Sequence, residues 1–179
     1  MGRLLERALE RAGLSEIRAR ALAGRGLPDP DLARLRGEDA LLVAGLADAV
    51  RAHFFGDDVR VLSNDAARRE PGLLRPSFVG SGAQGITGQE LLIEIAFARL
   101  AAPADRSLCV SFDALGLQLA QVALAFGADA LCGDLAGKRV LPLLDGPGAR
   151  RVELQGLLER AGRGVRFVDP QPPALESRS

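Results

Sequence analysis

The chain has 179 residues, enough for one domain with a real core, and its 47% hydrophobic and 26% charged residues are ordinary for a globular protein. Twenty-three basic residues balance twenty-three acidic ones and Trp and Tyr are absent, which argues against a nucleic-acid-binding surface built on basic charge and base stacking. No run approaches the ~18–20 apolar residues of a membrane helix, and two cysteines cannot form a disulfide framework, so we expect a cytoplasmic protein without membrane contact.

Residues 1–57 are expected to form a helical segment. Leucine and alanine recur at three-and-four spacing up to Gly13, and Ser15 is expected to cap a short helix that ends before the Gly- and Pro-rich residues 24–30. The clearest helix spans about residues 38–54. Its expected apolar stripe consists of Leu42, Leu46, Ala49, Val50 and His53.

Residues 58–63 read as a first strand, and residues 64–86 as an irregular loop without a sustained hydrophobic period. The loop contains G-x-G-x-x-G at Gly80, Gly82 and Gly85. A dinucleotide fingerprint needs this motif directly after a strand and at the start of a helix, and neither holds here. A flexible loop is the favoured interpretation, with phosphate binding at the helix that begins after Thr87 as the alternative.

Residues 87–169 alternate between helix and strand. Thr87 and Glu90 form a capping-box pattern ahead of a helix, and Gly127 and Gly162 are expected to end two later helices. The expected elements are helices at 88–100, 113–126 and 150–161 and strands at 107–112, 128–132 and 165–168, followed by a frayed tail at 170–179. This rhythm predicts an α/β fold with a mostly parallel sheet of three to four strands.

Few residues are candidates for chemistry. Asp113 and Asp134 each follow a predicted strand, at the edge where parallel-sheet proteins bind ligands, although helix capping is the favoured role of Asp113. His53 is the single histidine, and its place on the apolar stripe favours a core or half-buried imidazole over a catalytic one. Cys109 and Cys132 fit no zinc spacing and are expected to be small buried side chains on strands.

Two blocks of the sequence resemble one enzyme family. Residues 37–51 (GEDALLVAGLADAVR), with residues 56–61 (GDDVRV) and Asn64 after them, resemble the N-terminal region of the radical SAM enzymes of the futalosine route to menaquinone. Residues 95–100 (IAFARL), 115–129 (LGLQLAQVALAFGAD) and 154–162 (LQGLLERAG) are similar to the C-terminal motifs of these enzymes. The family comprises aminofutalosine synthase and dehypoxanthine futalosine cyclase, with the deazaflavin synthase subunits as close kin.

The chain departs from this family where the radical chemistry resides. The family binds a 4Fe–4S cluster through C-x-x-x-C-x-x-C soon after its first strand, and its middle strands bind S-adenosylmethionine and substrate, whereas residues 64–86 contain no cysteine. Ala130 also replaces the second Asp of the family's GADD motif, and Asp134 stands where Thr is usual. The resemblance therefore implies a shortened homologue that has no cofactor or metal.

If the family barrel is of the (βα)₈ type, its first strand and its last two are neighbours. Strands 58–63, 107–112 and 128–132 would then form a partial-barrel wedge with two open edges and a bare inner face. Open strand edges pair readily, so we expect a homodimer or a complex with a full-length radical SAM relative.

Three functional hypotheses follow. The first is a non-catalytic partner or nucleoside-binding remnant of the family. The second is an enzyme with non-radical activity on a futalosine-like nucleoside, using Asp113, Asp134 or His53. The third is a structural fold fragment without a ligand.

Overall fold

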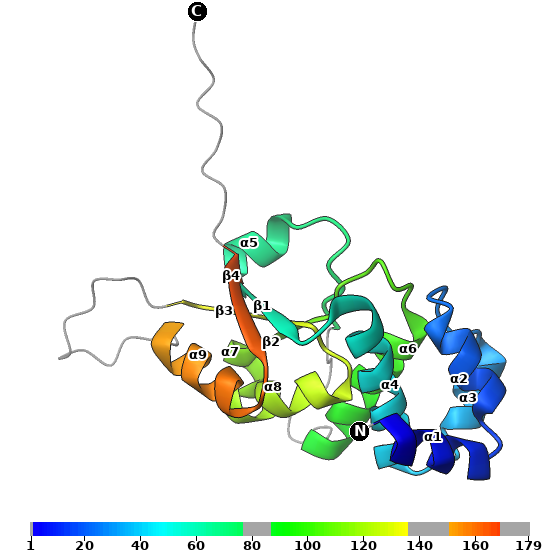
Figure 1. The fold of residues 1–179 in the computed structure, drawn as a ribbon. Helices are drawn as coiled ribbons and strands as arrows, with labels where there is room; N and C mark the ends of the chain where they lie inside the picture. Colours follow the sequence, from blue (N-terminus) through cyan, green and yellow to red (C-terminus); the bar gives the residue numbers. More distant parts are fainter. Residues whose placement is uncertain (1, 77–86, 136–150, 169–179) are drawn as a thin grey trace, which may run out of the picture.

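The structure is a computed structural model that describes residues 2–76, 87–135 and 151–168 (Figure 1). Its helices are α1 (Gly2–Arg11), α2 (Ser15–Leu22), α3 (Asp29–Leu35), α4 (Ala40–Phe55), α5 (Asn64–Arg69), α6 (Gly88–Ala101), α7 (Phe112–Leu115), α8 (Leu117–Ala123), the 3-10 turn η1 (Leu124–Phe126) and α9 (Arg151–Arg160). Its strands are β1 (Asp58–Ser63), β2 (Cys109–Ser111), β3 (Ala130–Gly133) and β4 (Gly164–Val168). The predicted α/β fold class is confirmed. The glycine motif at residues 80–85 and the tail at 170–179 lie outside the described residues.

The four strands form one parallel sheet in the order β2-β3-β1-β4. β1 pairs with β3 on one side and with β4 on the other, and β2 pairs with β3. The three strands of the predicted wedge are therefore neighbours in the predicted order. The last described strand, β4, pairs with the edge of β1 that the sequence predicts to be open.

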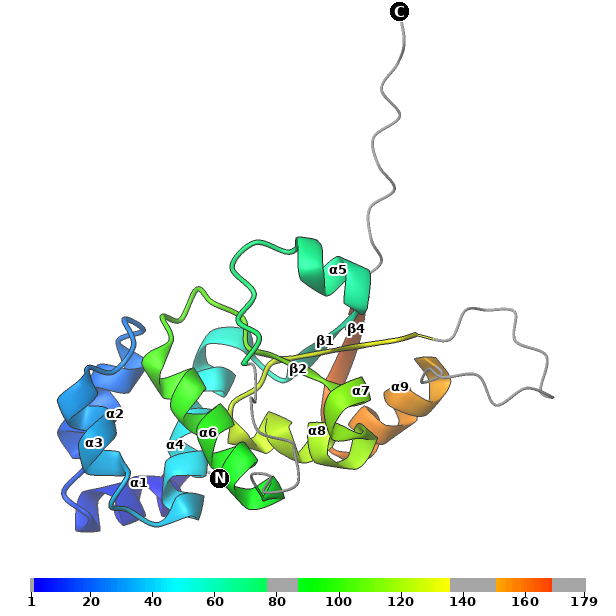
Figure 2. The same ribbon diagram turned by 180° about the vertical axis from the view of Figure 1, so that it is seen from behind.

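One face of the sheet carries the main core. Figures 1 and 2 both place α6, α8 and α9 on this side of the strands. Val59 and Val61 alternate along β1 with residues of the opposite face and pack with Ile95 of α6, Leu124 of η1 and Leu158 of α9, all of them buried. The apolar side of β1, where every second residue is hydrophobic, packs here on the apolar faces of the helices. This packing fixes which face of the sheet the helices cover.

The opposite face of the sheet is covered by α5. The sequence prediction of an irregular loop over residues 64–86 is wrong at its start, because residues 64–69 are helical. Ala66 and Ala67 of α5 pack with Leu62, Cys109 and Cys132, which are at most 2% exposed. The prediction of a bare inner face is wrong for the same reason.

The outer edge of β2 is also partly covered. Leu74 forms a parallel bridge with Leu108: the Leu74 amide donates to the Ser107 carbonyl at 2.8 Å, and the Leu74 carbonyl accepts from the Cys109 amide at 2.8 Å. Among the described residues, β4 has no further strand on its outer side. The predicted homodimer stays a prediction.

The N-terminal helices surround α4, which packs on α6 in a second apolar cluster. Asp39 caps α4 by accepting hydrogen bonds from the Leu41 and Leu42 amides at 2.9 and 3.2 Å. Ser15, in contrast, begins α2 and no side chain caps that helix. Residues 24–30 interrupt the helices only in part, since Pro30 lies in the first turn of α3, where a missing N–H costs nothing.

Two helix predictions need correction. The helix expected over residues 113–126 is divided into α7, α8 and η1, because Gly116 adopts a positive φ of 76° that ends α7. The buried face of α4 is rotated from the predicted stripe toward Asp48 and Arg51, and His53 is exposed. Among the described residues, no helix has the length and apolar content needed to cross a membrane.

The capping box at the start of α6 is present as predicted. The Thr87 amide donates to the Glu90 carboxylate at 2.8 Å, and the Glu90 amide donates to the Thr87 hydroxyl at 3.3 Å. The carboxylate thus occupies the helix N-terminus, where a phosphate was the alternative.

Acid is expected to loosen the start of α6. Hydrogen bonds from Thr87 hold the pKa of Glu90 below its ordinary value of 4.5, so this stabilisation is complete above pH 4.5 and is lost as the pH falls through the lowered pKa. Hydrogen exchange at the Thr87 amide should therefore accelerate over this acid range beyond the intrinsic pH dependence. A Glu90→Gln variant keeps a capping side chain that does not titrate, and it should show no such step.

Candidate functional site

Three polar side chains meet where neighbouring parallel strands end. Asn64 follows β1, Asp113 lies just after β2, and Asp134 follows β3. Asp113 Oδ2 accepts hydrogen bonds from Asn64 Nδ2 and from the Asp134 amide, both at 2.8 Å. We call Asn64, Asp113 and Asp134 the carboxyl-edge cluster. The structure therefore brings together two of the three residues that the sequence singled out, and adds Asn64.

The two corners that hold this cluster are built in the same way. Ser63 ends β1 and its hydroxyl accepts from the Ala66 amide at 3.2 Å; Ser111 ends β2 and accepts from the Ala114 amide at 3.4 Å. Both corners carry the pattern Ser-x-Asp-Ala. Serine at the N-cap satisfies an otherwise unpaired amide and starts a helix directly after the strand. This repeated pattern was the signal in the sequence for α5.

Asp113 does not cap a helix, contrary to the favoured interpretation of the sequence, because Ser111 takes that role. The Asp113 side chain is left to accept from Asn64 and Asp134, and its residue is exposed. Its second oxygen, Oδ1, has no hydrogen-bond partner among the described residues. Asp113 thus presents a fixed carboxylate with one oxygen available to a ligand.

Gly133 sets the position of the third strand at this edge. A Cβ atom built on Gly133 would overlap the ring of Phe112, which is buried at the start of α7. Only glycine lets β3 approach α7 this closely, and the approach brings the Asp134 amide to the Asp113 carboxylate.

His53 lies elsewhere. It is near the end of α4, which leads into the beginning of β1, whereas the cluster lies where β1 to β3 end. The His53 ring is exposed and contacts Phe54 edge-on, with 4.6 Å between the ring centroids. Within the described structure it shares no site with the two aspartates.

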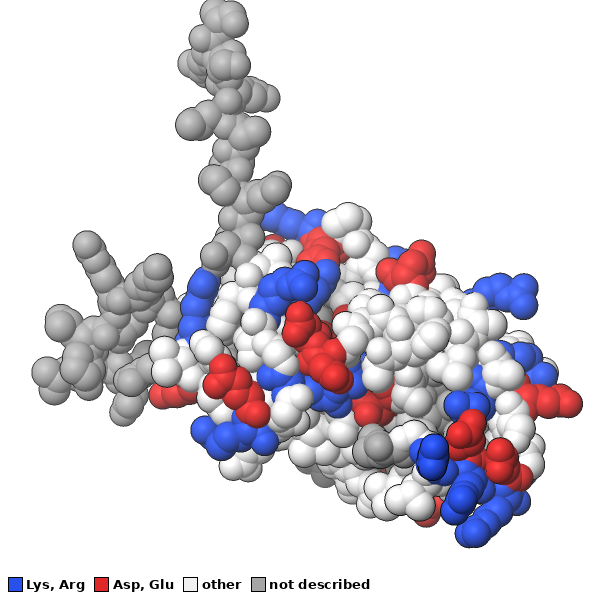
Figure 3. All heavy atoms as spheres, viewed as in Figure 1, with Lys and Arg blue, Asp and Glu red and all other residues white. Residues whose placement is uncertain are grey.

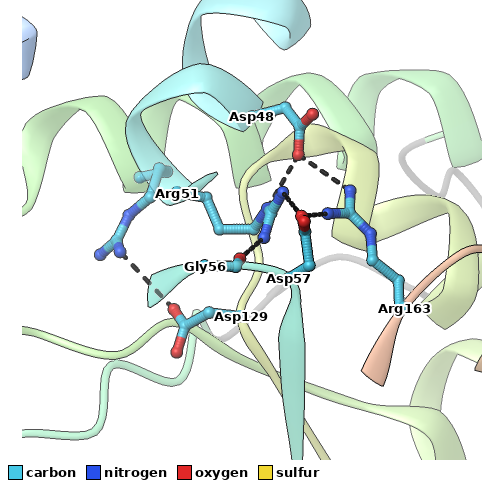
Figure 4. A network of polar contacts seen from close by, with 7 residues as sticks. Asp48, Arg51, Gly56, Asp57, Asp129 and Arg163 are labelled. Carbon is cyan, nitrogen blue, oxygen red and sulfur yellow. Dashed lines mark hydrogen bonds and ion pairs between the residues drawn. The ribbon is translucent and has the colours of Figure 1, made fainter. Parts of the chain in front are cut away.

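A network of charged side chains, of which Asp48 and Arg51 are buried, lies at the amino end of the sheet (Figure 4). Arg51 is 2% exposed and its Nε donates to Asp48 Oδ1 at 2.8 Å. Arg163, just before β4, binds Asp48 and Asp57 at 3.1 Å each. This network ties α4 to the starts of β1 and β4, so Asp57 has a structural role.

Asp129 and Arg99 form a second buried pair at this end. Asp129 Oδ1 accepts from the Leu108 amide at 2.7 Å and lies 3.5 Å from Arg99 Nη1, and its Oδ2 accepts from the Ser107 hydroxyl. Burial raises the pKa of Asp129 against the opposing effect of these hydrogen bonds and of Arg99, and burial lowers the pKa of Arg99. Because these residues are enclosed, they act on stability and not on a ligand.

A separate cavity of about 430 Å³ lies beside the beginning of β2. Its walls are mostly apolar and include Leu74, Ala98 and Leu108, with Arg75 and Arg106 as its cationic residues. On the face of the molecule in Figure 3, positive and negative side chains are interspersed. Neither sign of charge therefore dominates that face as a steering field.

The residues do not fit the cluster of the resembled family. The chain has two cysteines, and both lie in the sheet interior, so three thiolates on one loop are not available. Within the described residues there is no group of three or more side chains suited to holding a metal ion.

Comparisons with known proteins assign no family. No family model matches the chain, and no curated protein matches it.

Proposed function

We propose that this chain is a shortened relative of the futalosine-pathway radical SAM enzymes, and that it binds a nucleoside without performing radical chemistry. The strand order supports this proposal in part: closure of an eight-stranded barrel places strands seven and eight beside strand one, and β2 and β3 stand in that order beside β1, while β4 takes the other edge of β1. Barrel enzymes bind their ligands at the carboxyl ends of the strands, which is where the carboxyl-edge cluster lies.

The observation that carries the proposal is the fixed carboxylate of Asp113. An ionised carboxylate accepts hydrogen bonds and donates none, so it suits a ligand rich in hydroxyl donors. A ribose offers two neighbouring hydroxyl groups, and an acidic residue that binds them is a recurrent solution in nucleotide-binding sheets. Asp134 adds a second exposed carboxylate beside it.

A thermal-shift titration with S-adenosylmethionine, aminodeoxyfutalosine and dehypoxanthine futalosine tests the proposal. A ligand at 100 times its dissociation constant adds roughly 2.7 kcal/mol, so we expect one of the three nucleosides to raise Tm by about 5–10 °C. Asp113→Asn keeps one oxygen for Asn64 and Asp134 but loses the charge, and should weaken binding about tenfold or more.

Two controls locate the bound nucleoside. Asp65 occupies the corresponding place in the other Ser-x-Asp-Ala corner and its side chain is 69% exposed, so Asp65→Asn should leave binding unchanged. If Arg106→Ala weakens binding and Asp113→Asn does not, the ligand occupies the cavity beside β2 and the proposed site is wrong. A flat response to all three nucleosides would reject nucleoside binding and leave a protein partner as the hypothesis to test.

A further inference from the structure

The two cysteines lie side by side on the sheet face that α5 covers. Cys109 is in register with Ala130 on the adjacent strand, and Cys132 is in register with Ser111. Since side chains two residues apart share a face, Cys109, Ala130 and Cys132 all point to the same side. The two thiols are thus diagonal neighbours across β2 and β3.

This diagonal suits a bridging atom better than a disulfide. Adjacent strands are about 4.8 Å apart and two residues advance about 6.6 Å, which separates the two Cα atoms by about 8 Å. A disulfide needs Cα atoms closer than about 7 Å, so it would require backbone movement. The side chains of Cys109 and Cys132 nonetheless project from the same face into one buried cluster, where a single atom could bridge them.

The surroundings of the thiols restrict what could bind there. Cys109 and Cys132 are 2% and 0% exposed, and Leu62, Ala66 and Ala67 enclose them. No third His, Cys, Asp or Glu joins them within the described part of the chain. Zinc requires four ligands and is therefore a poor fit, whereas thiolate sulfur favours soft cations such as Cu(I), which accept two ligands.

Charge favours a monovalent cation. The positive charge of Arg75 acts on both sulfur atoms. A complex of two thiolates and one monovalent cation carries one negative charge, which Arg75 would offset.

We propose that Cys109 and Cys132 form a two-coordinate site for a soft monovalent metal ion, Cu(I) or its analogue Ag(I). Binding replaces both thiol protons, which pass to solvent, with one metal ion held between the two sulfur atoms. No electron is transferred. The site shares no residue with the proposed nucleoside site, which lies at the strand ends.

Anaerobic titration with Cu(I) in competition with a chromogenic chelator tests the proposal. We expect one Cu(I) per chain, a sulfur-to-metal charge-transfer band in the ultraviolet, and a raised Tm with either Cu(I) or Ag(I). Zn(II) should give none of these. Cys109→Ala and Cys132→Ala should each lower the affinity for Cu(I) more than about 100-fold, because loss of even an outer-shell partner costs 10–100-fold.

A matched control separates ligation from stability. Val110 is buried on the same strand and points to the opposite face, so Val110→Ala weakens the fold but should keep the Cu(I) affinity. Three results would each overturn the proposal. Either cysteine variant could keep the Cu(I) affinity of the unaltered protein, or the unaltered protein could bind Cu(I) no more tightly than a variant with both cysteines replaced by alanine. The third result is that diamide readily forms a Cys109–Cys132 disulfide in the folded protein.

Discussion

Replacing Asp129 with alanine is expected to lower the free energy of unfolding by about 3–5 kcal/mol. Asp129 is the only carboxylate paired with Arg99 in the described structure, and both residues are at most 2% exposed. Without the carboxylate, a buried guanidinium loses its counter-charge and the Leu108 amide loses its acceptor. Arg99 Nε and Nη1 already lack hydrogen-bond partners within the described residues, and the remaining hydrogen bond, from Nη2 to the Arg106 carbonyl, supplies no counter-charge.

Urea unfolding of a double-variant cycle gives the decisive comparison. Asp129→Leu with Arg99→Met removes both charges and should cost less than Asp129→Leu alone, because no buried charge then remains unpaired. Asp58 and Arg166 are an exposed pair, with side chains 58% and 68% exposed, so Asp58→Ala should change stability by less than about 1 kcal/mol. If Asp129→Ala lowers the free energy of unfolding no more than Asp58→Ala does, the Arg99 guanidinium becomes solvated once Asp129 is removed, and the expectation is wrong.

Glycine-to-alanine substitutions at Gly133 and at Gly156 are expected to change the free energy of unfolding in opposite directions. At Gly133 an added methyl group overlaps the Phe112 ring in the core, so Gly133→Ala should destabilise the protein by about 1–3 kcal/mol. At Gly156, inside α9, the nearest atom is 3.3 Å away at the end of the flexible Arg160 side chain. Gly156→Ala should therefore stabilise the helix by about 0.5–1 kcal/mol.

Thermal or urea unfolding of the two variants measures this difference. Gly133→Ala should also weaken nucleoside binding, since displacement of Phe112 moves Asp113 next to it, while Gly156→Ala should leave binding intact. Equal effects of the two substitutions on stability would mean that β3 and α7 can separate at little cost, and that the carboxyl edge is not held rigidly.

The candidate site was only partly predictable. Asp113 and Asp134 could be placed at one edge because parallel strands end on the same side of a sheet. The sequence does not single out Asn64, because its lack of a sustained period predicts one irregular segment over residues 64–86, although Ser63-Asn64-Asp65-Ala66 repeats the pattern of residues 111–114. The role of Asp113 was also mistaken, since the choice between Ser111 and Asp113 as the cap depends on a one-residue difference in where β2 ends.

Local sequence determined the elements whose signals are short-range. The capping box at Thr87, the strand at residues 58–63 and the alternation that makes the sheet parallel all follow from backbone hydrogen bonding and side-chain periodicity over a few residues. These energies arise between neighbours in the chain, so the sequence alone reports them.

Tertiary structure decided the features that depend on distant partners. The face that α4 buries includes Asp48 and Arg51, and Asp48 pairs with Arg163, which lies 115 residues away in the sequence. The position of β4 beside β1, the cover that α5 provides and the approach of Cys109 to Cys132 likewise join segments far apart in sequence. A buried charged group without a partner costs free energy, because it loses its hydration. The partner comes from a distant part of the sequence, so the pair exists only once the sheet has formed.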